Sequence, residues 1–216
     1  MNGLATTATG GVLICFAVKE EAIPFLRTAA SQRATILITG MGEENAEREL
    51  RTILKTVRPR LILTCGFAGG LNPNLPTGAV LFSGDESNFT HQLVACGAAP
   101  ATFFCAKRVA ITSKEKSEIH SIRKADAVEM ESAVIQRIAN ELTIPCVTIR
   151  VISDAAHEDL PLDFNSLMTD EFKIDFPKLI LHILLHPWKI PALLALQKKT
   201  QAAAENLSRT LDSLPI

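Results

Sequence analysis

The feature that most constrains this chain is a repeated alternation of short, continuous apolar runs with helical patterns. Short apolar runs are typical of buried strands, and their alternation with helices favours a mostly parallel sheet. We therefore predict a single α/β domain over residues 1–216, with a mixed, mostly parallel central sheet flanked by helices and a helical tail at about 176–212. The predicted strands are 11–18, 34–39, 60–65, 79–83, 108–112, 125–128 and 145–152. The predicted helices before the tail are 19–30, 43–57 and 132–142.

Charge and cysteine content narrow the class of protein. The chain has 22 basic and 23 acidic residues, so we expect no nucleic-acid partner, which usually requires a basic face. Five cysteines without a C-x-x-C pair predict free thiols in a reducing compartment. Residues 1–11 lack the pattern of a secretory signal, and no run of 18 uninterrupted apolar residues occurs. We expect a cytoplasmic protein.

Two glycine-rich segments follow predicted strands, where ligands bind in sheets of this kind. Gly40-Met41-Gly42 precedes a predicted helix, and such glycines let a ligand approach the backbone and the helix N–H groups. The alternative is an ordinary tight turn, because the third glycine of a dinucleotide-binding fingerprint is absent. The segment 66–71, which contains Phe67, Ala68 and Gly69, predicts either a close approach of the backbone to a ligand or another segment, or a flexible loop.

Two acidic motifs follow later strands. Glu129-Met130-Glu131 lies where a strand becomes a helix, so one carboxylate there either stabilises the helix start or binds a ligand. Ser153-Asp154 ends the last predicted strand. This pair either caps a following helix or supplies an acid for catalysis.

In this order and spacing, the four motifs resemble the nucleoside phosphorylase/nucleosidase family. That family includes purine nucleoside phosphorylases and the methylthioadenosine/S-adenosylhomocysteine nucleosidases. The resemblance runs from about Val12 to His157, and its most specific part pairs VEMESA at 128–133 with IRVISDAA at 149–156. CGFAGGL at 65–71 also matches the family well, whereas GMGEENA at 40–46 matches more loosely.

The resemblance implies a role for each matched residue. Glu131 binds the ribose 2′- and 3′-hydroxyls, and Met130 packs against the sugar. Such a carboxylate stabilises the positive charge of an oxocarbenium-like sugar. Asp154 protonates the purine at N7 or holds that proton in place, and as a general acid at neutral pH it would need a raised pKa. The remaining matched residues expected at the substrate are Gly42, Phe67, Ala68, Gly69 and Ser153.

The choice of nucleophile depends on two positions. Phosphorylases of the family hold phosphate with arginines and a loop serine, but Phe67 stands at that serine position and cannot hydrogen-bond phosphate. Nucleosidases carry a glutamate that activates water, and Glu21 matches it better than its neighbour Glu20. We therefore predict hydrolysis of a purine nucleoside, with adenine as the expected base. A phosphorylase and a non-catalytic nucleoside-binding module are the alternatives, and the presence of both Glu131 and Asp154 argues against the latter.

Two departures bear on the substrate. The segment between Ser83 and Val109 is shorter than in the methylthioadenosine nucleosidases, and residues 112–117 (TSKEKS) lack their base-stacking aromatic. The short middle segment, the apolar Phe67 in the glycine loop and the tail resemble the hopanoid-associated branch, which is assigned to removing adenine from adenosylhopane, a lipid. The expected substrates are therefore adenosylhopane or methylthioadenosine/S-adenosylhomocysteine.

The apolar segment 177–196 predicts a helix that covers the sheet or a subunit interface, or else a peripheral membrane contact with Trp188 and lysines at the lipid surface. His182 and His186 have the spacing of a helical metal pair, but Ile183 stands where a zinc protease has its catalytic glutamate. We expect no metal and no cofactor. Because members of the resembled family are usually oligomers, we expect a homodimer or higher homo-oligomer.

Overall fold

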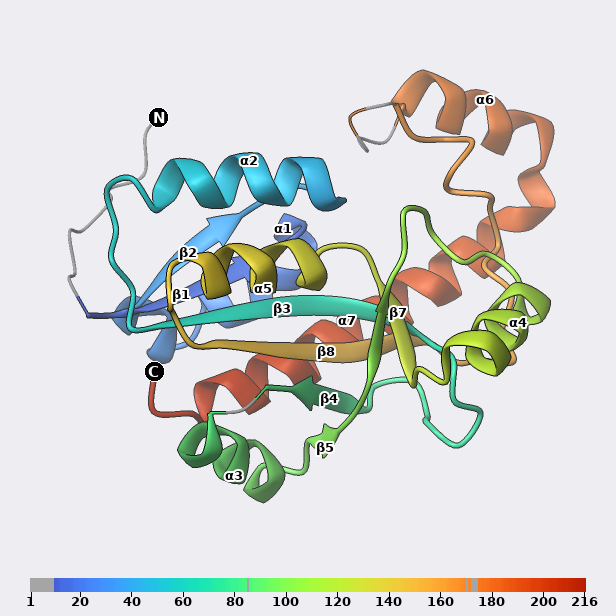
Figure 1. Ribbon diagram of the computed structural model, residues 1–216. Coiled ribbons are helices and arrows are strands. Elements are labelled where there is room, and N and C mark those ends of the chain that lie inside the picture. The colour runs from blue at the N-terminus through green and yellow to red at the C-terminus, as the bar shows by residue number, and fades with distance from the viewer. Residues whose placement is uncertain (1–9, 85, 170, 172–174) are drawn as a thin grey trace.

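A central sheet organises the chain in the computed structural model (Figure 1). The structure describes residues 10–84, 86–169, 171 and 175–216, and these form an eight-stranded sheet. The strand order is β2-β1-β3-β8-β4-β5, and β7 pairs with β3 and with β6. The strands are β1 (Val12–Phe16), β2 (Ala34–Ile38), β3 (Leu61–Gly70), β4 (Val80–Ser83), β5 (Ala99–Pro100), β6 (Phe103–Cys105), β7 (Ala127–Glu129) and β8 (Cys146–Asp154).

The two longest strands lie side by side at the centre of the sheet. β3 and β8 pair in parallel from Ile62↔Cys146 to Gly69↔Asp154, with an irregularity at Ala68/Gly69. β1 and β2 continue the parallel part, whereas β4 and β7 run antiparallel to their neighbours β8 and β3. This register brings the carboxyl ends of β3 and β8 together beside β7.

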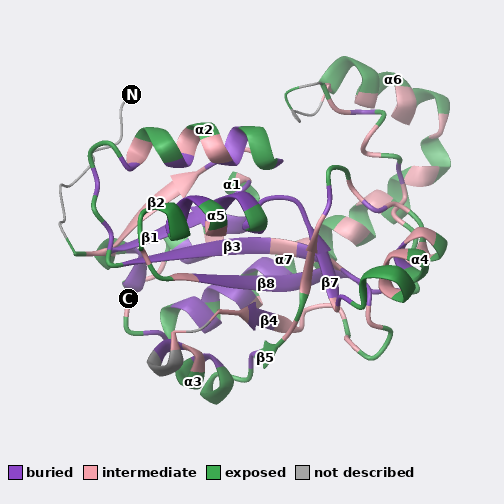
Figure 2. Ribbon diagram, viewed as in Figure 1, coloured by how far each residue is buried: buried purple, intermediate pink, exposed green. Residues whose placement is uncertain are grey.

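Helices cover both faces of the sheet, as the alternating pattern predicts. On one face, α1 and α7 pack with the sheet around buried residues such as Phe25 and Leu207. On the other face, α2 and α5 bury Leu50 and Ile138 (Figure 2). The helices before the tail are α1 (Lys19–Leu26), the 3-10 turn η1 (Ala30–Arg33), α2 (Glu43–Ile53), α3 (Ser87–Ala95), α4 (Ser113–Arg123) and α5 (Ser132–Glu141).

The tail consists of α6 (Phe176–Leu185), the 3-10 turn η2 (Pro187–Lys189) and α7 (Ile190–Asp212). The C-terminal half of α7 covers the sheet, whereas α6 projects from it and is largely exposed (Figures 1 and 2). Within the described residues no single helix is long and apolar enough to cross a membrane, although α6 together with η2–α7 passes that test as a pair bent by 102°.

The structure corrects several predicted boundaries. The glycine-rich segment 66–71 is mostly strand, because β3 continues to Gly70 while β8 and β7 pair along it. The predicted strand 108–112 is irregular, and the nearby strand is β6 instead. α1 ends at Leu26 rather than 30, two residues after Pro24, and α2 ends at Ile53 rather than 57. The predictions missed α3 and α4, where apolar spacing is weak.

Candidate active site

A cavity of about 260 Å³ opens beyond the carboxyl ends of β3 and β8. It is walled by the ends of β3, β7 and β8 and by the start of α1. The loop after β8 and the side of α7 that carries Leu196 and Thr200 add to it. Predicted site residues that line the cavity are Glu21, Phe67, Ala68, Gly69, Met130, Glu131, Ser153 and Asp154.

Glu131 lies buried at the junction of β7 and α5. Its Oε1 accepts a 2.9 Å hydrogen bond from the backbone N–H of Gly42, so Gly42 positions Glu131 instead of leaving that N–H free for a ligand. Its Oε2 lies 3.5 Å from Nη2 of Arg150. Burial raises the pKa of Glu131 to about 7, although Arg150 opposes the shift. Glu131 can therefore change charge near neutral pH, unlike an exposed glutamate.

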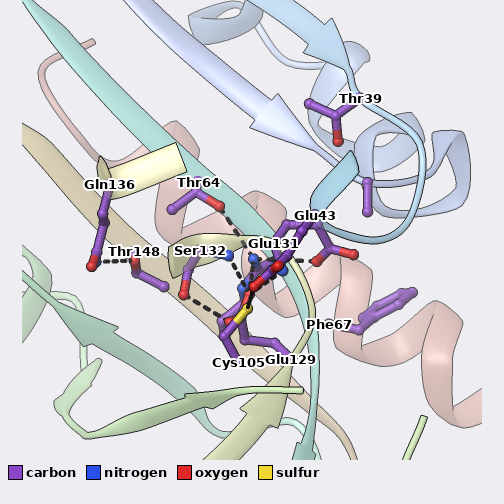
Figure 3. A network of polar contacts seen from close by, with 12 residues as sticks. Thr39, Glu43, Thr64, Phe67, Cys105, Glu129, Glu131, Ser132, Gln136 and Thr148 are labelled. Atoms are coloured by element: carbon purple, nitrogen blue, oxygen red, sulfur yellow. Dashed lines mark hydrogen bonds and ion pairs between the residues drawn. The ribbon is translucent and has the colours of Figure 1, made fainter. Parts of the chain in front are cut away.

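Glu129, two residues before Glu131, has a structural role. Its carboxylate accepts hydrogen bonds from the backbone N–H groups of Glu131 and Ser132, and from the Ser132 hydroxyl (Figure 3). It also lies 2.5 Å from Arg150 Nη2. Burial alone would raise the pKa of Glu129, but Arg150 and these hydrogen bonds hold it below its usual range. The helix-start role that the sequence offered for one carboxylate therefore belongs to Glu129.

Arg150 is a buried cation that sequence reasoning missed. The residue is 1% exposed, and its guanidinium lies among Glu129, Glu131 and Thr64. The nearby carboxylates raise its pKa despite burial, and Glu21 is one of them. Its place on β8, four residues before Asp154, was the available signal, because a charged residue within a buried strand requires a partner.

Glu21 reaches the cavity from the first turn of α1. Its Oε2 accepts hydrogen bonds from the backbone N–H groups of Ala17 (2.9 Å) and Val18 (3.1 Å), and its Oε1 accepts one from Phe67 (2.8 Å). Burial raises the pKa of Glu21 against the opposing effects of Arg150 and these three bonds. Glu20 is exposed, so the structure favours Glu21 for any role at the cavity.

Gly66 makes the approach of these groups possible. A Cβ atom at Gly66 would lie 2.5 Å from Oε1 of Glu21 and 2.7 Å from Nη1 of Arg150. Real Cβ atoms do not lie that close to other heavy atoms, so a side chain at this position would displace Glu21 and Arg150. Gly66 of the glycine-rich segment therefore allows the side chains of Glu21 and Arg150 to approach the backbone of β3 closely.

Asp154 is the last residue of β8 and lines the cavity. Its Oδ1 lies 2.6 Å from the Ser153 hydroxyl, and its Oδ2 forms an ion pair with Lys116 of α4. A Cβ at Gly69 would lie 3.2 Å from Cγ1 of Val128 and in ordinary van der Waals contact with Oδ2 of Asp154 at 3.5 Å, so the glycine relieves crowding against Val128 and the ion pair does not require it. An irregular segment follows β8, so the capping role offered for Ser153-Asp154 is wrong.

The structure thus gathers four carboxylates with different surroundings around one cavity, those of Glu21, Glu129, Glu131 and Asp154. The first three are linked to the Arg150 charge, and Asp154 is linked to Lys116. Sequence reasoning also missed Lys116, because α4 was not predicted. Other cavity residues that it missed come from segments distant along the chain, namely Arg108, Leu160, Phe164, Leu196 and Thr200.

Comparison with known proteins gives a consistent result. The family model described as the phosphorylase superfamily matches residues 15–97 and 94–184, which is most of the chain. Among curated proteins, the chain is 25% identical over 167 residues to a 5′-methylthioadenosine/S-adenosylhomocysteine nucleosidase of Glaesserella parasuis, covering 62% of this chain and 73% of that protein. It is 24% identical over 168 residues to an aminodeoxyfutalosine nucleosidase of Campylobacter jejuni, with coverage of 62% and 73%.

Solved structures share the fold over nearly the whole chain. The futalosine hydrolase of Helicobacter pylori strain 26695 superposes with a TM-score of 0.68 at 15% identity, covering 95% of this chain and 97% of that one. The 5′-methylthioadenosine/S-adenosylhomocysteine nucleosidase of Neisseria meningitidis, in complex with methylthio-immucillin-A, gives 0.67 at 17% identity, with coverage of 94% and 96%. At these identities the likeness establishes the fold.

Proposed function

Because this chain belongs to the phosphorylase superfamily, we propose that it is a nucleosidase that hydrolyses the N-glycosidic bond of a purine nucleoside, with adenine as the expected base. The observation that carries the proposal is the convergence of Glu21, Glu131 and Asp154 on one cavity. Its curated relatives carry nucleosidase names. The predicted class of enzyme and the geometry of the site therefore agree.

The three carboxylates divide the reaction among them. As the bond from C1′ to N9 breaks, its electron pair passes to the purine and the sugar becomes oxocarbenium-like. Glu131 binds the sugar hydroxyls and stabilises that positive charge, with Met130 against the sugar. Glu21 accepts a proton from water as the water oxygen attacks C1′. Asp154 donates a proton to N7 of the departing base or holds that proton in place. One water is consumed, and the free base and the ribose with its 5′ group are released.

Hydrolysis is favoured over phosphorolysis by the groups at the cavity. Phe67 presents an apolar ring to the cavity, and its one hydrogen-bond donor, the backbone N–H, already donates to Glu21. Among the described residues that line the cavity, Arg108 carries the sole positive charge, and its guanidinium is paired with Glu115. A phosphate dianion would lack the cluster of charged donors that usually binds it.

The test is release of free base from a panel of nucleosides, beginning with 5′-methylthioadenosine, with and without phosphate. We expect release in phosphate-free buffer and little stimulation by phosphate. Turnover that depends on phosphate would identify a phosphorylase. Absence of release from every nucleoside, together with binding of adenosine analogues, would identify a non-catalytic module. Asp154→Asn should lower release strongly, and equal release by the two proteins would remove Asp154 from the mechanism.

Apolar side chains in the cavity wall support an apolar 5′ group on the substrate. Leu160 and Phe164 of the segment after β8, together with Leu196 of α7, line the cavity. Apolar walls favour an apolar substituent because its transfer from water is favourable. We propose that the 5′ group is a thioether or a lipid, as in methylthioadenosine or adenosylhopane. Comparison of kcat/KM for adenosine and its 5′-alkylthio derivatives checks this, and a preference for adenosine would contradict it.

The exposed apolar face of the tail supports a peripheral membrane contact through residues 177–196. Large apolar side chains there are exposed, including Leu184 (72%) and Trp188 (69%). Helix α7, which follows them in the tail, carries Leu194, which is 53% exposed on the surface, and Leu196, which lines the cavity. Lys178 and Lys189 add positive charge suited to anionic headgroups. A lipid surface beside the cavity would deliver an amphiphilic substrate directly to the cavity.

Sedimentation with vesicles of phosphatidylethanolamine and phosphatidylglycerol tests this contact. Wild type should sediment with the vesicles, and Leu184→Glu should weaken sedimentation. Ile122→Glu is the matched control, because Ile122 is equally exposed (74%) on α4. No sedimentation of wild type would overturn the proposal. A dimer in light scattering that Leu184→Glu dissociates would instead assign the surface to a subunit interface.

A homo-oligomer and a cytoplasmic location are also part of the proposal. Light scattering after size-exclusion chromatography measures the oligomeric state, and cell fractionation measures location. We expect a dimer or larger assembly, and a protein that fractionates with the cytosol or with the cytosolic surface of membranes.

A further inference from the structure

Lys116 is a fully buried lysine whose surroundings single it out from the other lysines. It lies on α4 with its side chain 0% exposed. Its ammonium contacts Oδ2 of Asp154, the backbone O of Ala155 at 3.0 Å and the backbone O of Glu158 at 2.8 Å. An ammonium has three protons, so these three acceptors satisfy it completely. Burial of a charge is costly unless the charge is paired, and Asp154 is the paired group.

We propose that Lys116 is a positioning residue for the reaction, which holds Asp154 in place and supplies the proton that Asp154 delivers to the purine. This inference rests on the proposed function and deepens it. The motif that predicts Asp154 as an acid leaves the source of its proton unexplained. Because the Lys116 ammonium and Asp154 form a buried ion pair, Lys116 is the adjacent group that can supply this proton.

The proton balance of the step is simple. As the C1′–N9 bond breaks and its electron pair enters the purine, N7 takes a proton from Asp154. Asp154 takes one from the Lys116 ammonium in turn. The neutral amine keeps two N–H groups, and these still donate to the two carbonyl oxygens. After the base leaves, the pair regains a proton from solvent through Asp154, which borders the cavity whereas Lys116 does not.

Other charged groups near Lys116 have partners of their own. Glu158 is paired with Lys199 of α7 at 2.5 Å, and Asp159 accepts the backbone N–H of Ser113. On α4 itself, Glu115 is paired with Arg108 and accepts the N–H of Ile111. Asp154 is therefore the carboxylate in direct contact with the Lys116 ammonium among the described residues.

A double-mutant cycle with Lys116→Met and Asp154→Asn tests the proposal, with base release from 5′-methylthioadenosine as the readout. If Lys116 acts through Asp154, each single variant lowers kcat by about 10²-fold or more, and the double variant is no slower than Asp154→Asn. A purely structural Lys116 would make the two losses multiply. Lys114→Met is the matched control, because Lys114 is exposed two residues away on the same helix.

The split between kcat and KM gives a second readout that a general loss of packing would not give. Lys116 does not border the cavity, so Lys116→Met should lower kcat and leave KM for 5′-methylthioadenosine unchanged within about twofold. A KM that rises as much as kcat falls would overturn the proposal.

Two controls keep the result interpretable. Lys116→Gln replaces Lys116→Met if the latter fails to fold, as judged by its thermal midpoint, and the split between kcat and KM decides alone if Asp154→Asn falls below detection. The proposed function fails separately if wild type releases no base from any nucleoside. The Lys116 proposal fails if wild type is active and the losses multiply.

Discussion

Arg150 Nη2 lies 2.5 Å from Oε2 of Glu129, inside a sheet where neither side chain is more than 1% exposed. This contact fixes the centre of the site. Because Glu129 also accepts N–H groups at the start of α5, the guanidinium is held where its charge reaches Glu131 and Glu21. This buried ion pair therefore supports Glu131 and Glu21, two of the carboxylates assigned to the substrate.

Replacement of Arg150 by methionine should destabilise the protein strongly. Removing one partner of a buried pair leaves uncompensated carboxylates, which costs about 3–5 kcal/mol. Urea denaturation at pH 7.5 measures the free energy of unfolding. Arg137→Ala is the control, since Arg137 pairs with Glu47 and Glu141 on the exposed surface, where water screens the charges. Similar losses for the two variants would contradict the assignment of Arg150.

Replacement of Glu131 by glutamine should change how stability depends on pH. Glu131 has a pKa of about 7 in the folded protein and about 4.5 without its surroundings. Between these values the folded state binds more protons, so the free energy of unfolding falls as pH rises through the window. Glu131→Gln removes this fall, and the variant should gain up to about 3 kcal/mol relative to wild type between pH 4.5 and 7.5. Parallel stability curves for the two proteins would argue against the raised pKa.

Glu21→Gln should lower kcat. The neutral amide cannot accept the proton of water, and general base catalysis contributes about 10²–10⁴-fold. Glu20→Gln is the matched control, because Glu20 is exposed and adjacent in sequence. Rates of base release measure the effect. If Glu20→Gln were the slower variant, the assignment of the base would be reversed.

Gly66→Ala should impair activity through geometry. The added methyl group would meet Glu21 and Arg150 at less than 3 Å and displace both, and a shift of about 1 Å can cost about 10²-fold in rate. Gly97→Ala is the control, because Gly97 also has a positive φ but no heavy atom within 4 Å of an added Cβ. That control should lose some stability from backbone strain and keep its kcat/KM. A normal kcat/KM for Gly66→Ala would show that the close approach is not needed.

The local patterns of the sequence determined much of the fold. Continuous apolar runs predicted β1, β2, β4 and β8, and the apolar spacing of 132–142 predicted α5. These predictions succeeded because strand burial on both faces and helix amphipathicity leave a periodic signal along the chain. α3 and α4 left a weak signal, and β3 was predicted too short because glycines end most strands but not this one.

The sequence by itself also predicted that Glu21, Glu131 and Asp154 lie at or just after the carboxyl ends of strands, where ligands bind in such sheets. Only the tertiary structure decided their surroundings. Lys116 is 38 residues from Asp154, and Gly42 is 89 residues from Glu131, so no local pattern reveals either contact. The charge of a buried carboxylate depends on such distant partners and on exclusion of water, and both exist only after the chain has folded.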